Sequence, residues 1–496
     1  MKQLDLMAFD IGASNGRAIL GCFDGNKLTL SELLRFENEY RISENLFYWN
    51  AEGLFTRLKE AFAAYVAGGG KSLRAFGIDT WGVDFGLLDK NGHLIGSPRA
   101  YRCANDEEML AAWNTVSKRN IFNRTGVAAM NFNTLYQLYR RRMHRDAQLS
   151  EAQTMLLIPD LLGYYFTGDR LSEYTNVTTT NMFNPAAMDW DWSLIDAFEL
   201  PRHIFTPIDR AGSLRGKMMP GIADEIGIKA MPLVAVGTHD TASAVAAIPG
   251  RGSFAFCSSG TWSLFGVETD KAVLTDEVFG SNFSNEGTVQ GGFRPLKNIM
   301  GLWLIQRCRR AWNQKGMNLS WDDIVDAAQK EPPFRSIIDP DCPAFFADGD
   351  TGETMDMKIR SFCELTHQPV PETVGQVARC IYESLALKYR WAVERLEAIK
   401  AEPIDTLNIV GGGMLNKLLN QMSADATGRR VITGPTEGAC IGNLLMQAVA
   451  LGELSGIADV RDVVARSFET QEYEPHHTQA WEDAYHRMIG YMEAQG

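Results

Sequence analysis

Residues Asp10–Arg17 read DIGASNGR, and residues Ser258–Ser263 read SSGTWS. A short apolar run precedes each stretch, Leu4–Phe9 in the first case and Phe254–Cys257 in the second, and another apolar run follows each. Each stretch therefore predicts a β-hairpin whose two strands are joined by a tight Gly-rich turn. Backbone N–H groups in such a turn can converge on one spot, which suits a phosphate. One turn alone would favour a plain structural hairpin, but the pair predicts two related lobes that hold one polyphosphate.

The length and the charge of the chain narrow its class. A chain of 496 residues is too long for one core, so two domains are expected. The formal net charge of -13 argues against nucleic acid or an anionic membrane as a main partner. No stretch approaches the ~18 uninterrupted apolar residues of a membrane span, and the N-terminus has no long apolar leader. We therefore expect a cytoplasmic protein with no nucleic-acid partner and no membrane partner.

The eight cysteines include no C-x-x-C pair, which argues against a zinc site. They are interpreted as buried thiols. Cys363 and Cys380 flank the turn at residues 367–371 and could approach each other. A disulfide and a pair of free thiols both remain open, and a cytosolic location favours the thiols.

The order of the predicted elements indicates an α/β fold in two lobes. The first lobe, residues 1–248, contains a helix at Glu52–Ala67 and a buried strand at Met231–Val236, followed by a helix at Thr241–Ala247. We place the boundary near Pro249, and the second lobe, residues 249–496, repeats the hairpin opening. Its further predicted elements are helices at Asn298–Trp312, Pro371–Ile399, Asn416–Thr427 and Ile441–Leu451, and strands at Thr406–Val410 and Arg430–Thr433.

Two aspartates stand where catalysis of phosphoryl transfer would need them. Asp10 ends a strand beside the first Gly-rich turn, where a carboxylate can hold Mg²⁺ directly or through water. Taken alone, Asp10 fits equally well as a carboxylate that only caps its own turn. Asp240 follows a buried strand and opens a helix, so by itself it is most simply a helix cap. Its position near the boundary between two phosphate-binding lobes instead predicts the carboxylate that takes the proton of an acceptor hydroxyl.

A third Gly-rich segment, Gly411–Gly413, follows a predicted strand. Three residues without Cβ atoms permit a flat ring such as adenine to approach closely, although a bare loop is the plain alternative. The chain has no G-x-x-x-x-G-K-[ST] sequence, which excludes a P-loop ATPase, and it lacks the H-R-D and D-F-G motifs of protein kinases.

Together these motifs resemble the FGGY family of carbohydrate kinases, within the actin and sugar-kinase superfamily, from about residue 5 to about residue 451. The narrowest matches are GIDTWGVDF at Gly77–Phe85 and HDTASAV at His239–Val245. The stretches NTLYQL at Asn133–Leu138, EYTNVTTT at Glu173–Thr180 and LKNIMGLWL at Leu296–Leu304 also match. The resemblance implies two duplicated ribonuclease H-like domains that flank a catalytic cleft, with sugar, phosphate and the catalytic Asp in the first lobe and nucleotide in the second.

The resemblance also implies roles for individual residues. Asp240 would be the proton acceptor and would touch the ketose. The implied contacts of ATP are Ala13, Ser14, Asn15, Gly16, Arg17 and Thr261 at the phosphates, with Gln306 and Gly412 near the nucleoside. The implied contacts of the ketose are Gly82, His239, Thr241 and Asn298. Asn15 departs from the family pattern, which has a second Ser there, but it keeps a polar side chain.

The implied activity is transfer of phosphate from ATP, with Mg²⁺, to a small-molecule ketose. Within the family the resemblance is closest to members that phosphorylate L-rhamnulose at the C1 hydroxyl during L-rhamnose catabolism. Alternatives within the family are L-fuculose, a pentulose or a furanone-type signalling molecule as acceptor. A rival of another class is an actin-like or chaperone-like ATPase, although only about 45 residues follow Leu451 and leave no room for a peptide-binding domain.

Overall fold

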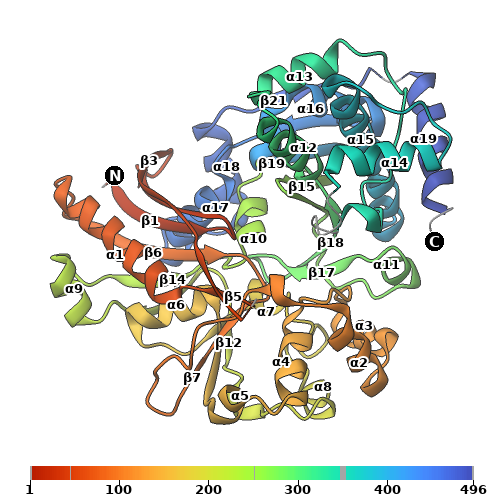
Figure 1. The fold of residues 1–496 in the computed structure, drawn as a ribbon. Helices are drawn as coiled ribbons and strands as arrows, with labels where there is room; N and C mark the ends of the chain where they lie inside the picture. The colour runs from red at the N-terminus through yellow and green to blue at the C-terminus, as the bar shows by residue number, and fades with distance from the viewer. Residues whose placement is uncertain (1–2, 45, 251, 347–352, 477, 494–496) are drawn as a thin grey trace. The chain divides into compact units, whose positions relative to one another are not determined.

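The computed structural model describes residues 3–44, 46–250, 252–346, 353–476 and 478–493 (Figure 1). The chain forms two compact units. Unit 1 contains Met1–Pro249, Glu268–Pro295 and Glu437–Phe468, and unit 2 contains Gly250–Val267, Leu296–Thr436 and Glu469–Gly496. The predicted division at 248/249 treats each lobe as one continuous segment; instead, residues 268–295 and 437–468 pack within unit 1. Arg251, beside the predicted boundary, lies outside the described residues.

Unit 1 is built on a six-stranded sheet with the order β13-β14-β6-β1-β2-β3. The first predicted hairpin is confirmed: β1 (Leu4–Ile11) pairs antiparallel with β2 (Asn15–Phe23). On its other side β1 pairs in parallel with β6 (Leu73–Thr80), which places Asp10 opposite Asp79. The remaining strands of this sheet are β3 (Leu28–Glu37), β13 (Ser213–Lys217) and β14 (Pro232–Ala235).

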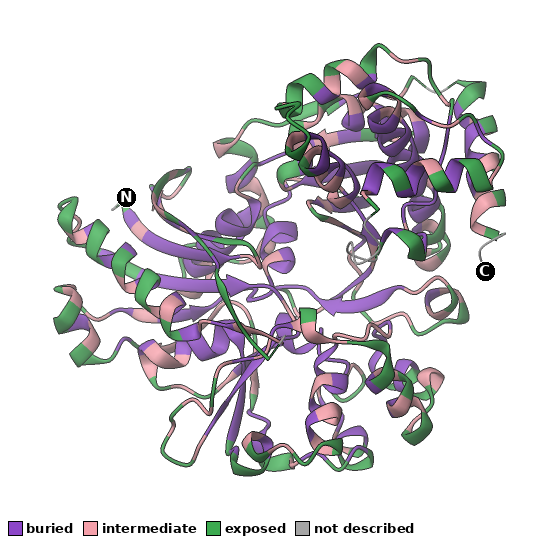
Figure 2. Ribbon diagram, viewed as in Figure 1, coloured by how far each residue is buried: buried purple, intermediate pink, exposed green. Residues whose placement is uncertain are grey.

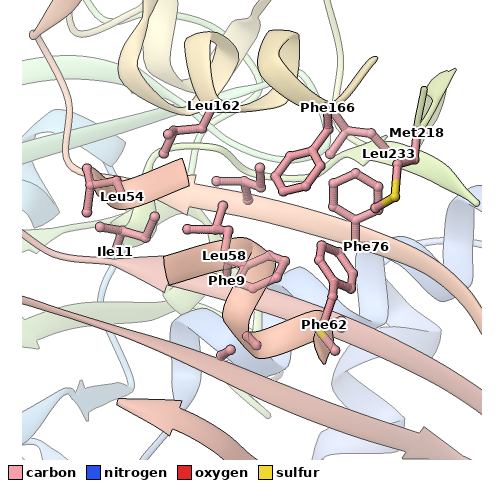
Figure 3. Close-up of a cluster of buried hydrophobic side chains, with 14 of the residues drawn as sticks. Phe9, Ile11, Leu54, Leu58, Phe62, Phe76, Leu162, Phe166, Met218 and Leu233 are labelled. Atoms are coloured by element: carbon pink, nitrogen blue, oxygen red, sulfur yellow. The ribbon is translucent and has the colours of Figure 1, made fainter. Parts of the chain in front are cut away.

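Strand β1 is buried on both faces, which explains its unbroken apolar run. Alternate residues belong to different cores: Met7 and Phe9 pack beneath helices α1 (Ala51–Ala67) and α6 (Ile158–Thr167), as Figure 3 shows for Phe9. Leu6, on the opposite face, joins the core formed with α17 (Gly438–Ala450). Helix α17 therefore belongs to unit 1, because its apolar side chains complete this core.

An aromatic cluster fastens α1 and α6 to the sheet. Phe62 of α1 lies edge-on to Phe9 and to Phe76, with ring centroids 5.2 and 5.4 Å apart, and Phe166 of α6 lies 5.6 Å from Phe62 (Figure 3). Edge-to-face pairs of this kind add about 0.5–1.5 kcal/mol each beyond the apolar area that they bury. Figure 2 shows that the strands beneath them are almost entirely buried.

Beyond the six-stranded sheet, unit 1 contains the antiparallel strand pair β7 (Phe85–Leu88) and β8 (Thr154–Leu157). The other elements of unit 1 are β4 (Tyr40–Ser43), β5 (Leu46–Trp49), α2 (Asp106–Thr115), α3 (Lys118–Thr125), α4 (Thr134–Met143), α5 (Ala147–Glu151), β9 (Ser172–Glu173), α7 (Tyr174–Val177), β10 (Phe183–Asn184), β11 (Asp189–Trp190), α8 (Trp192–Ala197), β12 (Ile208–Asp209), α9 (Pro220–Ile226), α10 (Asp240–Ala246), α11 (Asp276–Gly280), β17 (Ser284–Gly287) and α18 (Ile457–Ser467).

Unit 2 repeats the strand order of unit 1. The second predicted hairpin is confirmed as β15 (Phe254–Ser259) and β16 (Trp262–Gly266), and β15 pairs in parallel with β19 (Thr406–Val410). With β18 (Phe293–Met300), the order β19-β15-β16-β18 matches β6-β1-β2-β3, with the same antiparallel hairpin at its centre. The other elements are α12 (Trp303–Gln314), α13 (Trp321–Gln329), α14 (Met355–Leu365), α15 (Val374–Lys400), α16 (Lys417–Thr427), β20 (Arg430–Thr433), β21 (Gln471–Tyr473) and α19 (Gln479–Glu493).

The predicted helix at Asn298–Trp312 is wrong over its first part. Strand β18 (Phe293–Met300) begins in unit 1 and continues into unit 2, and α12 begins only at Trp303. Residues 296–300 pair antiparallel with β16, so sheet pairing overrides the local apolar pattern. Asn298 consequently lies on a strand, opposite Leu264.

The cysteines are free thiols in the structure, and six of the eight are buried. Cys363 on α14 and Cys380 on α15 lie within hydrogen-bonding reach of each other, which confirms their expected proximity. Among the described helices, none has both the length and the apolar character that a membrane crossing would require.

Candidate functional site

The turn of the first hairpin is closed by its own backbone and by Asn38. Gly12 N donates to Asn15 O at 2.8 Å, and the Asn38 side chain donates to Gly12 O at 2.9 Å. Ser14 and Asn15 are exposed at the tip, whereas Gly16 is buried. A Cβ atom on Gly16 would lie 2.4 Å from the ring of Phe36, so a larger residue there would have to displace that ring.

Asp10 and Arg17 lie at the base of this turn, facing each other across the hairpin. Arg17 Nη2 is 2.5 Å from Asp10 Oδ2, and Arg17 Nε lies 2.9 Å from Glu437 Oε2 just before α17. Arg17, which is predicted to contact phosphate, therefore lies between the carboxylates of Asp10 and Glu437. Glu437 was not predicted, because it belongs to a segment more than 400 residues away from Arg17 in the chain.

Asp79 is a second residue that the sequence reasoning missed. It is fully buried at the end of β6, in register with Asp10, and Asn443 of α17 donates to its Oδ2 at 2.6 Å. Its Oδ1 has no hydrogen-bond partner among the described residues. Burial raises the pKa of Asp79 well above its usual range, and the negative charges of Asp10 and Asp240 add to the shift. The sequence feature that could have identified Asp79 is its position near the end of a predicted strand, which it shares with Asp10.

Asp240 is the first residue of α10, and His239 is the N-cap. Asp240 Oδ1 accepts hydrogen bonds from Thr241 N at 2.6 Å and from Thr241 Oγ1 at 3.1 Å. Burial raises the pKa of the Asp240 carboxyl, the neighbouring His239 opposes this shift, and the charge of Asp10 adds to it. A raised pKa makes this carboxylate a stronger base than a free aspartate.

The loop before α10 is fixed by Glu173, a fully buried carboxylate in β9. Thr238 donates to Glu173 Oε2 through its N–H at 3.0 Å and through its hydroxyl at 2.8 Å, and Thr175 donates to the same oxygen. Burial raises the pKa of Glu173 to about 7, against the effect of these donors. His239 N in turn donates to Thr175 Oγ1 at 3.2 Å. These bonds hold His239 and Asp240 in place.

Gly82 lies in a short segment between β6 and β7 that is organised around Asp84. A Cβ atom on Gly82 would lie 3.0 Å from the side chain of Thr179, so a larger residue would have to displace that threonine. Asp84 is buried, and burial raises its pKa to about 6 although four donors oppose the shift. The donors are Trp49 Nε1 at 2.6 Å, Trp81 Nε1 at 3.0 Å, Tyr101 N at 3.1 Å and Gln137 Nε2 at 3.1 Å.

In unit 2 the second hairpin turn brings two predicted residues, Thr261 and Gln306, together. Gly301 N and Trp303 N both donate to Thr261 O, which fixes the start of α12 against the turn. Thr261 Oγ1 then donates to Gln306 Oε1 at 3.3 Å. Gly413 packs on Ser259 of β15, whereas a Cβ on Gly412 would meet nothing within 4 Å. Gly412 therefore presents an open surface beside the strand that precedes Thr261.

The predicted site residues divide between the two units. Unit 1 holds Ala13, Ser14, Asn15, Gly16, Arg17, Asp10, Gly82, His239, Asp240 and Thr241, and unit 2 holds Thr261, Asn298, Gln306 and Gly412. Within unit 1 the structure places the charges of Asp10, Asp79 and Asp240 near one another. Within unit 2 it joins Thr261 to Gln306.

The carboxylates of unit 1 fit a Mg²⁺ ion that arrives with nucleotide. In the described part of the chain, no three His, Cys, Asp or Glu side chains form a group able to hold a metal by themselves. Mg²⁺ in phosphoryl-transfer sites commonly keeps several waters and takes only one or two carboxylates in addition to phosphate oxygens. Asp10 at the turn and the unpartnered Oδ1 of Asp79 supply oxygen ligands of that kind.

Comparison with known proteins identifies the chain's relatives. Sequence profiles of the FGGY family of carbohydrate kinases match residues 6–247 as the N-terminal domain and residues 255–451 as the C-terminal domain. A protein named rhamnulokinase from Bacteroides thetaiotaomicron is 41% identical over 490 residues, covering 98% of both chains. A rhamnulokinase from Oceanobacillus iheyensis is 35% identical and covers 95% of this chain and 98% of its own.

Solved structures with low sequence identity share the fold. A xylulose kinase from Lactobacillus acidophilus superposes with a TM-score of 0.80 at 14% identity, covering 99% of this chain and 97% of its own. A glycerol kinase from Plasmodium falciparum, crystallised with ADP, has a TM-score of 0.78 at 14% identity and covers 98% of each chain. The two α/β units therefore have the architecture of two-domain sugar kinases.

Proposed function

This chain belongs to the FGGY family of carbohydrate kinases, and on that premise we propose that it phosphorylates L-rhamnulose at the C1 hydroxyl. The reaction uses ATP and yields L-rhamnulose 1-phosphate and ADP, as a step of L-rhamnose catabolism. The choice of sugar rests on the rhamnulokinases that are 35–41% identical over nearly the whole chain. The structural neighbours named for xylulose, gluconate and glycerol are at most 16% identical and support the fold alone.

The observation that carries the chemistry is the carboxylate of Asp240. Its Oδ1 is oriented by the N–H and the hydroxyl of Thr241, and its pKa is raised by burial. A carboxylate oriented in this way accepts the proton of the sugar's C1 hydroxyl as that oxygen bonds to the γ-phosphorus and the bond to the ADP oxygen breaks. Gly82, His239, Thr241 and Asn298 are proposed to hold the ketose so that C1 faces Asp240.

The nucleotide is proposed to contact both Gly-rich turns. Ala13–Arg17 and Thr261 donate hydrogen bonds to the phosphates, and Gln306 and Gly412 lie near the nucleoside. Arg17 contributes a guanidinium that its pairing with Asp10 and Glu437 holds at the turn. Mg²⁺, when bound, neutralises developing negative charge on the phosphate oxygens, and Asp10 is proposed to be its nearest protein ligand. We place the reaction in the cytoplasm, because that compartment supplies the ATP that it consumes.

A panel of sugars assayed with MgATP tests this proposal. L-rhamnulose should give the highest kcat/KM, ahead of L-fuculose, D-xylulose, L-ribulose and a furanone-type acceptor. A higher kcat/KM for another acceptor would transfer the proposal to that sugar. Rapid ATP hydrolysis that is indifferent to every sugar would instead support a nucleotide-switch ATPase.

A further inference from the structure

His239, which is proposed to contact the sugar, has a buried ion pair behind it. Its Nδ1 is 3.1 Å from Glu286 Oε2 in β17, and its Nε2 is 3.7 Å from Asp240 Oδ1. Arg294 of β18 lies beside both groups, with Nη2 3.2 Å from the same Oε2 and 3.4 Å from His239 Nδ1. All four residues belong to unit 1, and neither the sequence motifs nor the comparisons assign a role to Glu286 or Arg294.

The donors and acceptors in this group can be assigned from their chemistry. A carboxylate accepts and a guanidinium donates, so Glu286 Oε2 accepts from both His239 Nδ1 and Arg294 Nη2. Arg294 Nη2 is also 3.4 Å from His239 Nδ1, a longer separation than the 3.1 Å to Glu286. Nδ1 can make only one in-plane hydrogen bond, and the shorter contact to a carboxylate selects Nδ1–H as the donor. A neutral imidazole then has its lone pair on Nε2.

We propose that Glu286 and Arg294 are positioning residues that hold His239 as the Nδ1–H tautomer, so that Nε2 accepts a hydrogen bond from a second hydroxyl of the sugar. This inference rests on the proposed kinase function. Nε2 and the Asp240 carboxylate then form two adjacent acceptors, with Nε2 3.7 Å from Oδ1. One accepts the proton of the reacting hydroxyl, and the other recognises a neighbouring hydroxyl that does not react. The pair of acceptors therefore selects substrates with two hydroxyl donors at this end.

The positive charge of Arg294 offsets part of the negative charge that Glu286 places beside His239. A lone carboxylate against Nδ1 would favour the imidazolium form, whose Nε2–H would bond Asp240 and compete with the substrate for the base. The Arg294 guanidinium is fully buried, and its Nε donates to Gly287 O at 2.9 Å, which fixes it beside Glu286. Contacts with His239 and Arg294 hold the pKa of Glu286 below its usual value despite burial, so the carboxylate stays ionised beside them.

The groups that face His239 come from each element around it. They are Glu286 from β17, Arg294 from β18, Asp240 from α10 and the Thr175 hydroxyl from α7, which accepts the backbone N–H of His239. Glu173 stands behind Thr175 and Thr238, bonded to both. Among these groups, only Glu286 and Arg294 contact the Nδ1 side of the ring.

Glu286→Gln tests the pair by removing the charge while keeping the shape. Loss of a hydrogen bond to a charged group should raise the KM for L-rhamnulose by about 10- to 100-fold, leaving the KM for ATP unchanged. The effect should fall mainly on KM, because the lost contact involves a hydroxyl that does not react. In a His239→Gln background, Glu286→Gln should cause no further change in sugar KM, because the carboxylate acts through the imidazole.

Asp191→Asn is the matched control. Asp191 is also a buried carboxylate of unit 1 paired with an arginine, since Arg124 donates to both its oxygens at 2.9 and 2.7 Å. This variant should change the melting temperature without moving the sugar KM. An equal rise of sugar KM in Asp191→Asn, or additive losses in the His239 double variant, would reduce Glu286 to a structural residue.

Long-range ¹H–¹⁵N spectroscopy of the wild-type enzyme tests the tautomer directly and does not depend on how a variant folds. The His239 signal, identified by its loss in His239→Gln, should show a protonated Nδ1 and an unprotonated Nε2. An Nε2–H tautomer or an imidazolium at neutral pH would overturn the proposal. If wild-type enzyme phosphorylated no ketose, the proposed function would fail, and this spectrum would still decide the arrangement of Glu286 and His239.

Discussion

Asp240→Asn separates the chemistry of the site from its folding. The substitution keeps the side-chain oxygen that accepts from Thr241 N and Thr241 Oγ1, so α10 should begin as before. Removing the negative charge forfeits its attraction to the positive end of the helix, typically 0.3–1 kcal/mol. The substitution also removes the free-energy cost of burying a charged carboxylate, which is the cost that raises the pKa of Asp240. These two contributions oppose each other, and we expect stability to change by less than about 1 kcal/mol.

The kinetic effect should be much larger. Loss of the general base lowers the rate by on the order of 10²–10⁴, which raises the barrier by about 2.7–5.5 kcal/mol. Because the other proposed contacts of the sugar and of ATP are unchanged, the affinities for L-rhamnulose and for ATP should remain near the wild-type values. The measurement is kcat from ADP release at saturation with both substrates, together with calorimetric binding of each.

Asp106→Asn provides the control, since Asp106 is likewise the first residue of a helix, α2, and its Oδ1 accepts a hydrogen bond from Asn131 Nδ2 at 2.9 Å. It should keep the wild-type kcat. A kcat near the wild-type value in Asp240→Asn would remove Asp240 from the mechanism and leave it as a residue of the first helical turn.

Three further predictions follow from the same structure. Thr261→Val should raise the KM for ATP about 10- to 100-fold and leave the KM for sugar unchanged, because a hydroxyl donor to phosphate is lost; an unchanged KM for ATP would contradict the two-turn interpretation. Gly413→Ala should lower stability by about 1–3 kcal/mol by overpacking, since its Cβ would lie 1.9 Å from Ser259 Oγ. Gly412→Ala should leave stability unchanged, because its Cβ meets nothing within 4 Å. Equal melting temperatures for the two variants would refute this. Burial raises the pKa of Asp84 to about 6, so its ionised carboxyl opposes folding above that pH. Between pH 7 and pH 4 the proton binds first to the folded state, so the free energy of unfolding of the wild type should rise by up to about 3 kcal/mol relative to that of Asp84→Asn. Parallel stability–pH curves for the two proteins would show that the pKa is not raised.

Local sequence was enough to predict the two hairpins, helix α1 and the strands β14, β19 and β20. Their signals act over a few residues: apolar runs end at glycine, and an apolar stripe recurs every three or four positions in Glu52–Ala67. The motifs around Asp10, Gly82 and Asp240 also predicted the family, which the sequence profiles confirm. The roles assigned to individual site residues stay predictions.

Tertiary structure decided what depends on residues distant in the chain. Residues 296–300 form a strand because β16 offers them hydrogen-bond partners, although the local pattern resembles a helix. Helix α17 joins unit 1 because the face opposite α1 needs an apolar cover. Asp79 acquires its partner from Asn443 in the same way. The carboxylate behind His239 comes from Glu286, 47 positions further on, and no local periodicity records such a contact. Hydrogen bonds and ion pairs select groups by distance in space, so only the folded chain brings these side chains together.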